Sequence, residues 1–402
     1  MREMKDSGIE WVGKIPTKWT IAKAKNCVEI QNGSDPKTEG SIPVYGSGSM
    51  SFKTCGEYKE GPSVLIGRKG ATLHIPHYIS SKFWNVDTAF NVYSKSIFDL
   101  KYYFYCAHVF DYTLYMSQTT LPSMTQTAYE NMFLPLPTKE EQYAIANQLD
   151  QICSKIDAVL EKTRASIEEY KKLKQTVITQ VVTKGVRGDR PMKDSGIEWI
   201  GDIPAEWNKD KVIRVFSVIG SGTTPKSSDE NLFDGNTPWI QSGDINGENL
   251  FVTKNCVSNS AIESYSALRV YQAPYLVVAM YGASVGNLSL SMIDACVNQA
   301  CCVLKKPTIN LKFSFYIFKA VKDYLARKAV GGGQPNISQE TIKQLWLPIP
   351  SADEQIEISN YLDEKCRSVD ALIAKKQQYI TEIENYKKSL IYEYVTGKKE
   401  VV

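Results

Sequence analysis

Residues 140–183 read EEQYAIANQLDQICSKIDAVLEKTRASIEEYKKLKQTVITQVVT, and apolar residues recur along this stretch at a regular spacing. From Ile145 through Leu149 and Ile152 to Ile156, the steps alternate between four and three residues. This is the spacing of the a and d positions of a helix that packs lengthwise against another helix. The pattern predicts one long helix, roughly 66 Å in length at about 1.5 Å per residue.

A second copy of this helix is predicted 213 residues further along the chain. The two predicted seams comprise Ile145, Leu149, Ile152, Ile156, Val159, Thr163, Ser166, Tyr170, Leu173 and Val177 in the first helix, and Ile358, Leu362, Lys365, Val369, Leu372, Lys376, Tyr379, Ile383, Tyr386 and Leu390 in the second. The alternative interpretation is a pair of ordinary amphipathic helices, each packed on a separate core.

Both copies begin in the same way. LPLP at 134–137 returns as LPIP at 347–350, and the EQ pair at 141–142 returns at 354–355. The prolines stop any helix before them. Thr138 and Ser351 are suited to the N-cap, with Glu141 and Glu354 in position to complete a capping box.

The chain also repeats outside the helices. MKDSGIEWVGKIP at 4–16 returns as MKDSGIEWIGDIP at 192–204, and Trp19 returns as Trp207. This offset is 188 residues rather than 213, so the second half carries 25 additional residues before its helix. The chain is therefore a tandem duplication of a module followed by a helix. We predict a first domain at 1–138, a central helix at 139–186, a second domain at 187–350 and a distal helix at 351–402.

Each module reads as mixed α and β. Strands that run into glycine turns are predicted within 42–52 and 63–71 of the first module, and within 239–246 and 275–288 of the second. Aromatic-rich segments at 101–116 and 313–330 are predicted to be helices. The predicted fold class is α+β, with two mixed α/β domains in a pseudo-two-fold tandem repeat, separated by two long antiparallel helices.

Composition sets broad limits. A net charge of +3 is compatible with nucleic-acid binding but is weak support for it. The N-terminus does not resemble a signal peptide, and no apolar run reaches membrane-spanning length. The nine scattered cysteines lack a CxxC pair, which favours reduced thiols and a cytoplasmic protein without a membrane partner.

Motifs for catalysis are absent from the sequence. It has no GxxxxGK[ST] phosphate loop and no DPPY or NPPY tetrapeptide of an amino-methylating enzyme, and GSGSMS at 46–51 has only two of the three glycines of a dinucleotide fingerprint. His74, His77 and His108 could form a zinc set with Cys106, but Pro76 interrupts the pair and the second module has no counterpart. We expect neither a catalytic residue nor a metal site.

Polar side chains on glycine-rich loops suit the reading of nucleic acid. Arginine and lysine reach phosphates or guanine, and glutamine and asparagine can pair with adenine. Each residue taken singly is equally compatible with a solvated loop. The candidate DNA-binding residues are Tyr45, Ser47, Arg68, Lys69, Thr119 and Ser123 in the first module, and Gln241, Ser242, Asp244, Tyr281, Ser284, Gln334 and Asn336 in the second.

The DSGIEW(V/I)GxIPxxW opening, the RKGA and YGASVG turns, the GGGQPNIS–LPIP–EQ approach and the VTGK ending together resemble the specificity subunit of type I restriction-modification systems. The resemblance covers nearly the whole chain. The first module departs from it, with TLPSMT where the second has GGGQPNIS. Base contacts vary in this family, so the resemblance itself does not assign them.

The resemblance implies two target recognition domains that each read half of a bipartite DNA site, with the helices as spacer. It implies double-stranded DNA, two methyltransferase subunits and, where a nuclease is present, restriction subunits as partners. S-adenosylmethionine, ATP and magnesium are then expected only in those partners, and this chain is non-catalytic. Two other functions stay open from the residues: a structural coiled-coil adaptor without base readout, and an enzyme with an unrecognised site.

Overall fold

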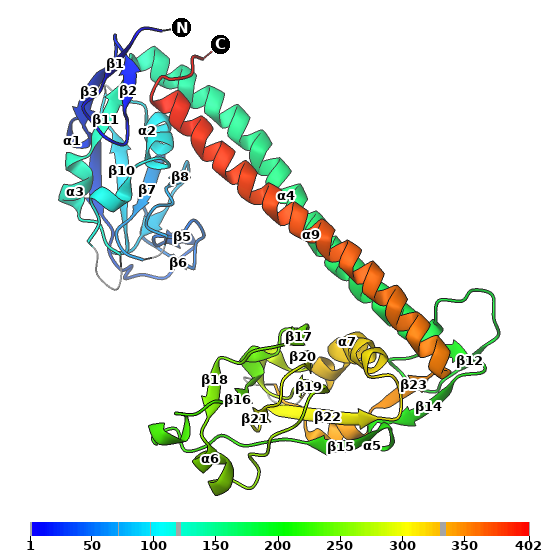
Figure 1. Ribbon diagram of the computed structural model, residues 1–402. Coiled ribbons are helices and arrows are strands. Elements are labelled where there is room, and N and C mark those ends of the chain that lie inside the picture. The colour runs from blue at the N-terminus through cyan, green and yellow to red at the C-terminus, as the bar shows by residue number, and fades with distance from the viewer. Residues whose placement is uncertain (1, 71, 97, 118–121, 330–334, 402) are drawn as a thin grey trace. The chain divides into compact units, whose positions relative to one another are not determined.

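The computed structural model describes residues 2–70, 72–96, 98–117, 122–329 and 335–401. The chain divides into two units, Met1–Ala165 with Lys376–Val402, and Ser166–Lys375. Each unit contains one globular module, the beginning of one long helix and the end of the other (Figure 1). Mixed modules joined to a helical spacer confirm the predicted α+β class.

The two larger sheets of the first module form its centre. A four-stranded antiparallel sheet has the order β4-β10-β7-β8, and a smaller sheet has the order β6-β5-β9, with β5 and β9 parallel. The strands are β4 (Val28–Asn32), β5 (Ile42–Tyr45), β6 (Lys53–Cys55), β7 (Ser63–Gly67), β8 (His77–Ile79), β9 (Trp84–Asn85) and β10 (Ala89–Ser94). Helix α2 (Leu100–Ala107) buries its aromatic residues in the core of this unit.

The second module repeats this topology and adds to it. Its larger sheet has the order β15-β22-β19-β20-β17 and its smaller sheet the order β18-β16-β21. The strands are β15 (Phe216–Gly220), β16 (Thr237–Ile240), β17 (Asn249–Leu250), β18 (Asn255–Val257), β19 (Tyr275–Ala279), β20 (Leu288–Ser291), β21 (Cys296–Val297) and β22 (Cys301–Pro307), followed by helix α7 (Leu311–Lys328). Among the described residues of the first module, nothing corresponds to strand β17, helix α6 (Asn259–Ser264) or the 3-10 turn η2 (Glu230–Leu232), which locates the additional residues.

Short strand pairs and single turns complete each half. In the first half, β1 (Met4–Asp6) pairs with β2 (Lys14–Pro16), and β3 (Thr20–Lys23) pairs with β11 (Phe133–Leu136), which precedes α4; the short helices are α1 (Ala24–Cys27), η1 (Tyr112–Leu114) and α3 (Gln126–Asn131). In the second half, β12 (Met192–Asp194) pairs with β13 (Asp202–Pro204), and β14 (Asn208–Lys211) pairs with β23 (Trp346–Ile349), which precedes α9; the short helices are α5 (Val212–Val215), η3 (Ser242–Asp244), η4 (Gly282–Ser284) and α8 (Gln339–Lys343).

The helix expected at 101–116 is shorter than predicted. It ends at Ala107, and the chain restarts as the 3-10 turn η1. The Asp111 side chain accepts the backbone N–H of Thr113 at 3.0 Å, which stabilises this new start. Phe110 and Tyr112 remain buried, so aromatic composition alone did not reveal the break.

The long helices are α4 (Lys139–Lys184) and α9 (Ala352–Val395). In the first unit, Lys387 Nζ lies 2.6 Å from Asp157, and Arg164 pairs with Glu384. In the second unit, Lys174 Nζ lies 2.6 Å from Asp370. From Asp157 to Arg164 the residue number in α4 rises, while that of the partner in α9 falls from Lys387 to Glu384, so the two helices run antiparallel in the first unit. In the second unit, residues 178–182 of α4 share a buried core with residues 358–366 of α9, which extends this pairing.

The structure corrects the predicted seam. From residue 152 in α4 and from residue 365 in α9, every second predicted position is replaced by the residue that follows it. Ile145, Leu149, Ile358, Leu362 and Leu390 are buried, and Ile152, Ile156, Tyr170, Val369 and Ile383 are partly buried. By contrast, Leu173 is 50% exposed and Leu372 is 42% exposed. The next positions along each helix face inward instead. Leu160 and Ile167 in α4 and Cys366 and Ile380 in α9 are buried, and Lys174, Ile373 and Lys387 are partly buried.

The EQ pair ties the start of each long helix to its module. Gln142 Oε1 accepts the Asp99 backbone N–H at 2.7 Å, and Gln355 Oε1 accepts that of Asn310 at the same distance. Asp99 and Asn310 in turn cap helices α2 and α7. One buried glutamine therefore aligns two helix starts in each half.

The glutamate of the pair binds the repeated tryptophan. Trp19 Nε1 donates to Glu141 at 3.1 Å, and Trp207 Nε1 donates to Glu354 at 2.8 Å. Thr138 and Glu141 form both hydrogen bonds of the predicted capping box. Glu354 instead pairs with Arg190 at 2.6 Å, in a site where both side chains are largely buried.

We predict that Leu160→Ala destabilises the chain by about 2–5 kcal/mol, because truncation of a buried leucine leaves a cavity. Val159→Ala is the matched control, since Val159 is 41% exposed whereas Leu160 is 4% exposed. Urea unfolding followed by circular dichroism measures both variants. A larger loss of unfolding free energy for Val159→Ala than for Leu160→Ala would support the seam predicted from the sequence.

Candidate nucleic-acid interface

Two loop segments of the first module are joined through their backbones beyond the end of β7. The Met124 N–H donates to the Arg68 carbonyl at 2.9 Å, and the Gly70 N–H donates to that of Pro122 at 3.1 Å. Lys69 and Ser123 therefore lie opposite each other, as in a short antiparallel ladder. A third segment joins them, because the Thr88 carbonyl accepts the Arg68 N–H at 2.8 Å.

The hairpin between β5 and β6 lies against the same loops. Ser47 Oγ is 3.0 Å from Thr72 Oγ1, and the Tyr45 carbonyl accepts the Val86 N–H at 3.0 Å. The Tyr45 ring packs beside His77 at a centroid distance of 5.5 Å. The structure thus brings together five predicted residues, which we name the first loop cluster: Tyr45, Ser47, Arg68, Lys69 and Ser123.

The cations of the first loop cluster are only weakly neutralised. Lys69 Nζ lies 3.8 Å from Asp87, and both side chains are about half exposed. Such an exposed pair contributes little to stability, so Lys69 can exchange Asp87 for another anion at small cost. The Arg68 guanidinium lies 5.7 Å from the centre of the Phe90 ring.

The second module repeats the backbone arrangement with other side chains. The Ile337 N–H donates to the Met280 carbonyl at 2.9 Å, and the Gly282 N–H donates to that of Pro335 at 2.8 Å. Tyr281 and Asn336 consequently face each other where Lys69 and Ser123 do in the first module. Tyr281 is 45% exposed, and its carbonyl accepts the Ser284 hydroxyl at 3.0 Å.

The remaining predicted residues of this module lie on turn η3. Asp244 accepts the backbone N–H groups of Gln241 at 2.9 Å and Lys254 at 3.3 Å, so its carboxylate shapes the loop. Gln241 Oε1 accepts from Asn255 at 2.9 Å, and Ser242 is partly exposed beside it. The second loop cluster comprises Gln241, Ser242, Asp244, Tyr281, Ser284 and Asn336. Thr119 and Gln334 lie outside the described residues.

Sequence reasoning missed the turn that connects the loops of each cluster. The Thr88 carbonyl accepts the Arg68 N–H, and at the corresponding place the Ala300 carbonyl accepts the Met280 N–H at 2.8 Å. In the second module the Asn298 N–H also donates to Ile240, just before Gln241. The available signal was a short polar interruption between apolar strands in both repeats, at 87–88 and 298–299.

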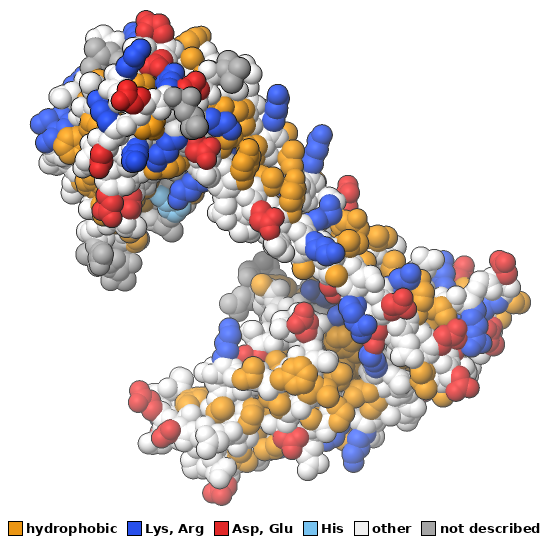
Figure 2. Space-filling view, turned by 45° about the horizontal axis from the view of Figure 1, so that its top comes forward, with side chains coloured by type: hydrophobic (Ala, Val, Ile, Leu, Met, Phe, Trp, Pro, Cys, Tyr) orange, Lys and Arg blue, Asp and Glu red, His pale blue; other side chains and the backbone are white. Residues whose placement is uncertain are grey.

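Charge is mixed on the face shown in Figure 2, where basic and acidic side chains intersperse over both modules and along the helices. This agrees with the net charge of +3. Phosphate binding on this face would depend on individual cations, not on one broad basic field.

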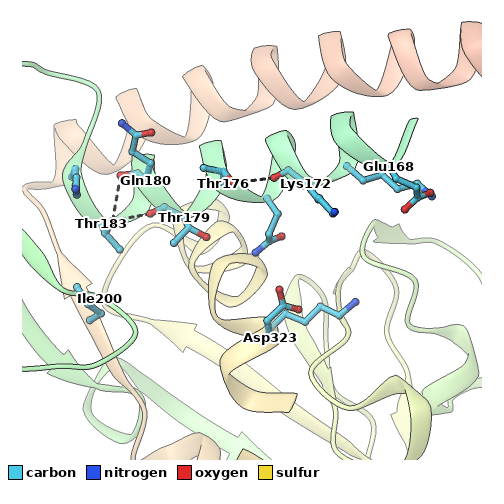
Figure 3. A pocket seen from close by; sticks show the side chains of 12 residues that line it. Glu168, Lys172, Thr176, Thr179, Gln180, Thr183, Ile200 and Asp323 are labelled. Carbon is cyan, nitrogen blue, oxygen red and sulfur yellow. Dashed lines mark hydrogen bonds and ion pairs between the residues drawn. The ribbon is translucent and has the colours of Figure 1, made fainter. Parts of the chain in front are cut away.

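A groove of about 920 Å³ lies in the second unit, between α4 and α7. Its lining includes Lys172, Thr176, Thr183 and Asp323 (Figure 3). The Thr176 and Thr183 hydroxyls donate to carbonyls one turn earlier in α4, which leaves them as weak ligands. No residue of the second loop cluster lines this groove.

The histidines do not form a cluster. His108 packs edge-on against Phe104 at 4.6 Å, and burial with nearby Lys387 lowers the pKa of His108 to about 4. His77 instead lies beside Tyr45. Within the part of the chain that the structure describes, no three His, Cys, Asp or Glu side chains gather in a metal-binding arrangement. Over the same residues, no helix combines the length and apolarity needed to span a bilayer.

Lys59 lies between the two larger sheets of the first module. Its ammonium donates to Asn91 Oδ1 at 2.6 Å, Asn85 Oδ1 at 2.8 Å and the Asn32 carbonyl at 3.1 Å. These acceptors are neutral, and burial lowers the pKa of Lys59 to about 8. In the second module the corresponding layer is apolar, with Tyr271, Val297 and Val303 in one core.

We predict that the titration of Lys59 adds stability to the first unit as the pH increases from about 8 to about 10.5, opposing the loss from buried Cys27, Cys106 and Cys153, whose pKa values burial raises. Over this range the folded chain has lost the Lys59 proton while the unfolded chain retains it, so the desolvation penalty of the charged form disappears. Urea unfolding midpoints at successive pH values measure the effect. The parent should gain stability relative to Lys59→Met as the pH rises, whereas its difference from Lys82→Met, at an exposed lysine, should stay constant. A constant difference between the parent and Lys59→Met would contradict this assignment.

Comparison with known proteins matches this architecture. The family model described as the type I restriction modification DNA specificity domain matches residues 16–169 and 204–385. The type I restriction enzyme MjaVIII specificity subunit of Methanocaldococcus jannaschii is 26% identical over 294 residues, covering 70% of this chain and 66% of that protein. A provisionally named MjaX specificity subunit of the same organism is 26% identical over 283 residues, covering 69% and 62%. The chain thus spans somewhat less than two thirds of the length of these curated relatives.

A solved chain from a study of complex assembly and conformational transition in the type I R-M system has the same fold. It superposes with a TM-score of 0.72 at 15% identity, over 96% of this chain and 99% of the solved one. The family model covers most of the chain and includes both modules. This chain therefore belongs to the type I restriction-modification DNA specificity domain family.

Proposed function

We propose that this chain is the DNA specificity subunit of a type I restriction-modification complex, and that each module reads one half of a bipartite site in duplex DNA. One observation carries the proposal. The two modules hold their loops with the same backbone hydrogen bonds but present different side chains, Lys69 with Ser123 in one and Tyr281 with Asn336 in the other. A common framework with unlike loops is what two readers of unlike half-sites require.

The chemistry of the clusters suits this division. In the first loop cluster, Arg68 and Lys69 can contact phosphates or guanine. In the second, Asn336 and Gln241 carry amides that can pair with adenine, and Tyr281 offers an exposed hydroxyl. The modules are therefore expected to prefer different bases.

The long helices are proposed to fix the spacing and rotation of the two half-sites and to dock two methyltransferase subunits, with restriction subunits joining where a nuclease is present. A stiff spacer suits this role, because the faces of DNA repeat every 34–36 Å or so along the duplex. Methylation and cleavage are assigned to the partners, which would hold S-adenosylmethionine, ATP and magnesium. This chain would supply recognition alone, in the cytoplasm.

Exchange of residues 20–133 for the corresponding segment of another family member should change only one half of the recognised site. Sequencing of methylated DNA from cells that carry the hybrid and its methyltransferase subunits measures both halves at once. Exchange of the second module is the reciprocal control and should change only the other half. Unchanged specificity in both hybrids would favour a coiled-coil adaptor that does not read bases.

A further inference from the structure

The hairpin between β5 and β6 exposes two apolar side chains near the first loop cluster. Met50 is 83% exposed and Phe52 is 60% exposed. Single exposed apolar residues are ordinary. A methionine and a phenylalanine on one narrow, glycine-containing hairpin are a more particular arrangement, because both project from a segment that adjoins cations.

The position of the hairpin is fixed by close contacts. A Cβ built on Gly46 would lie 2.9 Å from Thr88 Oγ1 and 3.8 Å from the Phe52 ring, so the three groups adjoin one another. The Thr88 carbonyl accepts the N–H groups of Arg68 at 2.8 Å and Lys69 at 3.4 Å. Phe52 therefore lies beside the turn whose Thr88 carbonyl accepts the backbone N–H groups of both cations of the first loop cluster.

Positive charge also borders the hairpin itself. Lys53 Nζ lies 5.5 Å from the centre of the Phe52 ring, and Lys69 is held only by its exposed ion pair with Asp87 at 3.8 Å. A narrow apolar tip bordered by lysines matches the combined chemistry of a base step and its flanking phosphates. Proteins that insert Phe, Leu, Ile or Met between base pairs use this combination to unstack and bend the duplex.

The second module is built differently at this place. Its corresponding loop folds into η3, which Asp244 closes through backbone N–H groups. Its exposed Phe251 and Val252 follow β17, where Leu250 pairs with Ser291. Tyr281 lies beyond the opposite end of β19 and β20, since Val278 pairs with Leu288. The exposed apolar pair beside the reading loops therefore belongs to the first module.

We infer that Met50 and Phe52 form an apolar wedge that enters a base step of the half-site read by the first module and partly unstacks it. The inference rests on the proposed DNA-reading function. Pyrimidine–purine steps unstack most easily, so the wedge would enter such a step at the lowest cost. Met50 and Phe52 would thereby contribute to sequence specificity without a hydrogen bond to a base.

The test uses the full chain assembled with its methyltransferase subunits on duplex DNA. 2-Aminopurine is placed in turn at positions of the first half-site other than the methylated adenine. The parent complex should raise the fluorescence at one step. The Met50→Ser/Phe52→Ser variant should lose that increase and bind about 10-fold more weakly. Phe251→Ser/Val252→Ser, a matched exposed pair, should keep both the signal and the affinity.

The outcomes separate the two proposals. Since both wedge side chains are exposed, the variant should unfold at the same temperature as the parent and assemble with the same subunits. The wedge would be overturned if the variant kept the fluorescence increase and the affinity of the parent. It would also be overturned if the variant failed to assemble with its subunits and lost the signal for that reason. Either result would leave DNA reading intact. A parent complex without sequence preference for DNA would overturn the proposed function and the wedge together.

Discussion

The core of each module is completed by the end of a long helix that starts in the other repeat. In the first unit, Leu390, Ile391 and Val395 at the end of α9 share one core with Trp19 and Ile145. The buried Tyr102 hydroxyl also donates to the Val395 carbonyl at 2.8 Å. In the second unit the end of α4 has this role, through Ile178, Val181 and Val182. Because each helix begins in one core and ends in the other, the two helices must run antiparallel.

This shared construction separates framework from loops. The anchors at the helix starts are the same in both halves: a tryptophan on a glutamate, and a glutamine that reaches the cap of α2 or α7. A further repeated contact joins α2 to α4 and α7 to α9. The Tyr105 hydroxyl of α2 donates to Asp150 of α4 at 2.7 Å, and the Tyr316 hydroxyl of α7 donates to Asp363 of α9 at 2.6 Å. The loop clusters lie apart from these contacts, so their side chains can differ without loss of the fold.

Much of this framework could be predicted from the sequence. The two offsets, the helix lengths and the capping residues are all local or periodic signals, and they survive into the structure. The predicted helix seam differed from the observed one because burial between the two helices does not follow the apolar character of the residues. Lys174 and Lys387 occupy seam positions with only 22% and 23% of their side chains exposed, since their alkyl chains pack inward while Asp370 and Asp157 hold the ammonium groups at the edge. The apolar neighbours Leu173 and Tyr386 remain exposed.

The loop clusters were predictable as sets of polar residues, but not as structures. Their assembly depends on backbone hydrogen bonds between segments distant in sequence, such as Arg68 with Met124, which no local pattern encodes. Lys59 is a second example. Its partly buried position follows from Asn85 and Asn91 on other strands, and the same layer of the second module is apolar.

The most direct test of the helices as a spacer is to lengthen both by one heptad, between residues 165 and 166 in α4 and between 375 and 376 in α9. These insertions preserve the ion pairs within each unit and keep the seam in phase. Seven residues add about 10 Å, or roughly three base pairs. Methylation mapping should then find both half-sites unchanged and the gap between them about three base pairs longer. An unchanged gap would contradict the account.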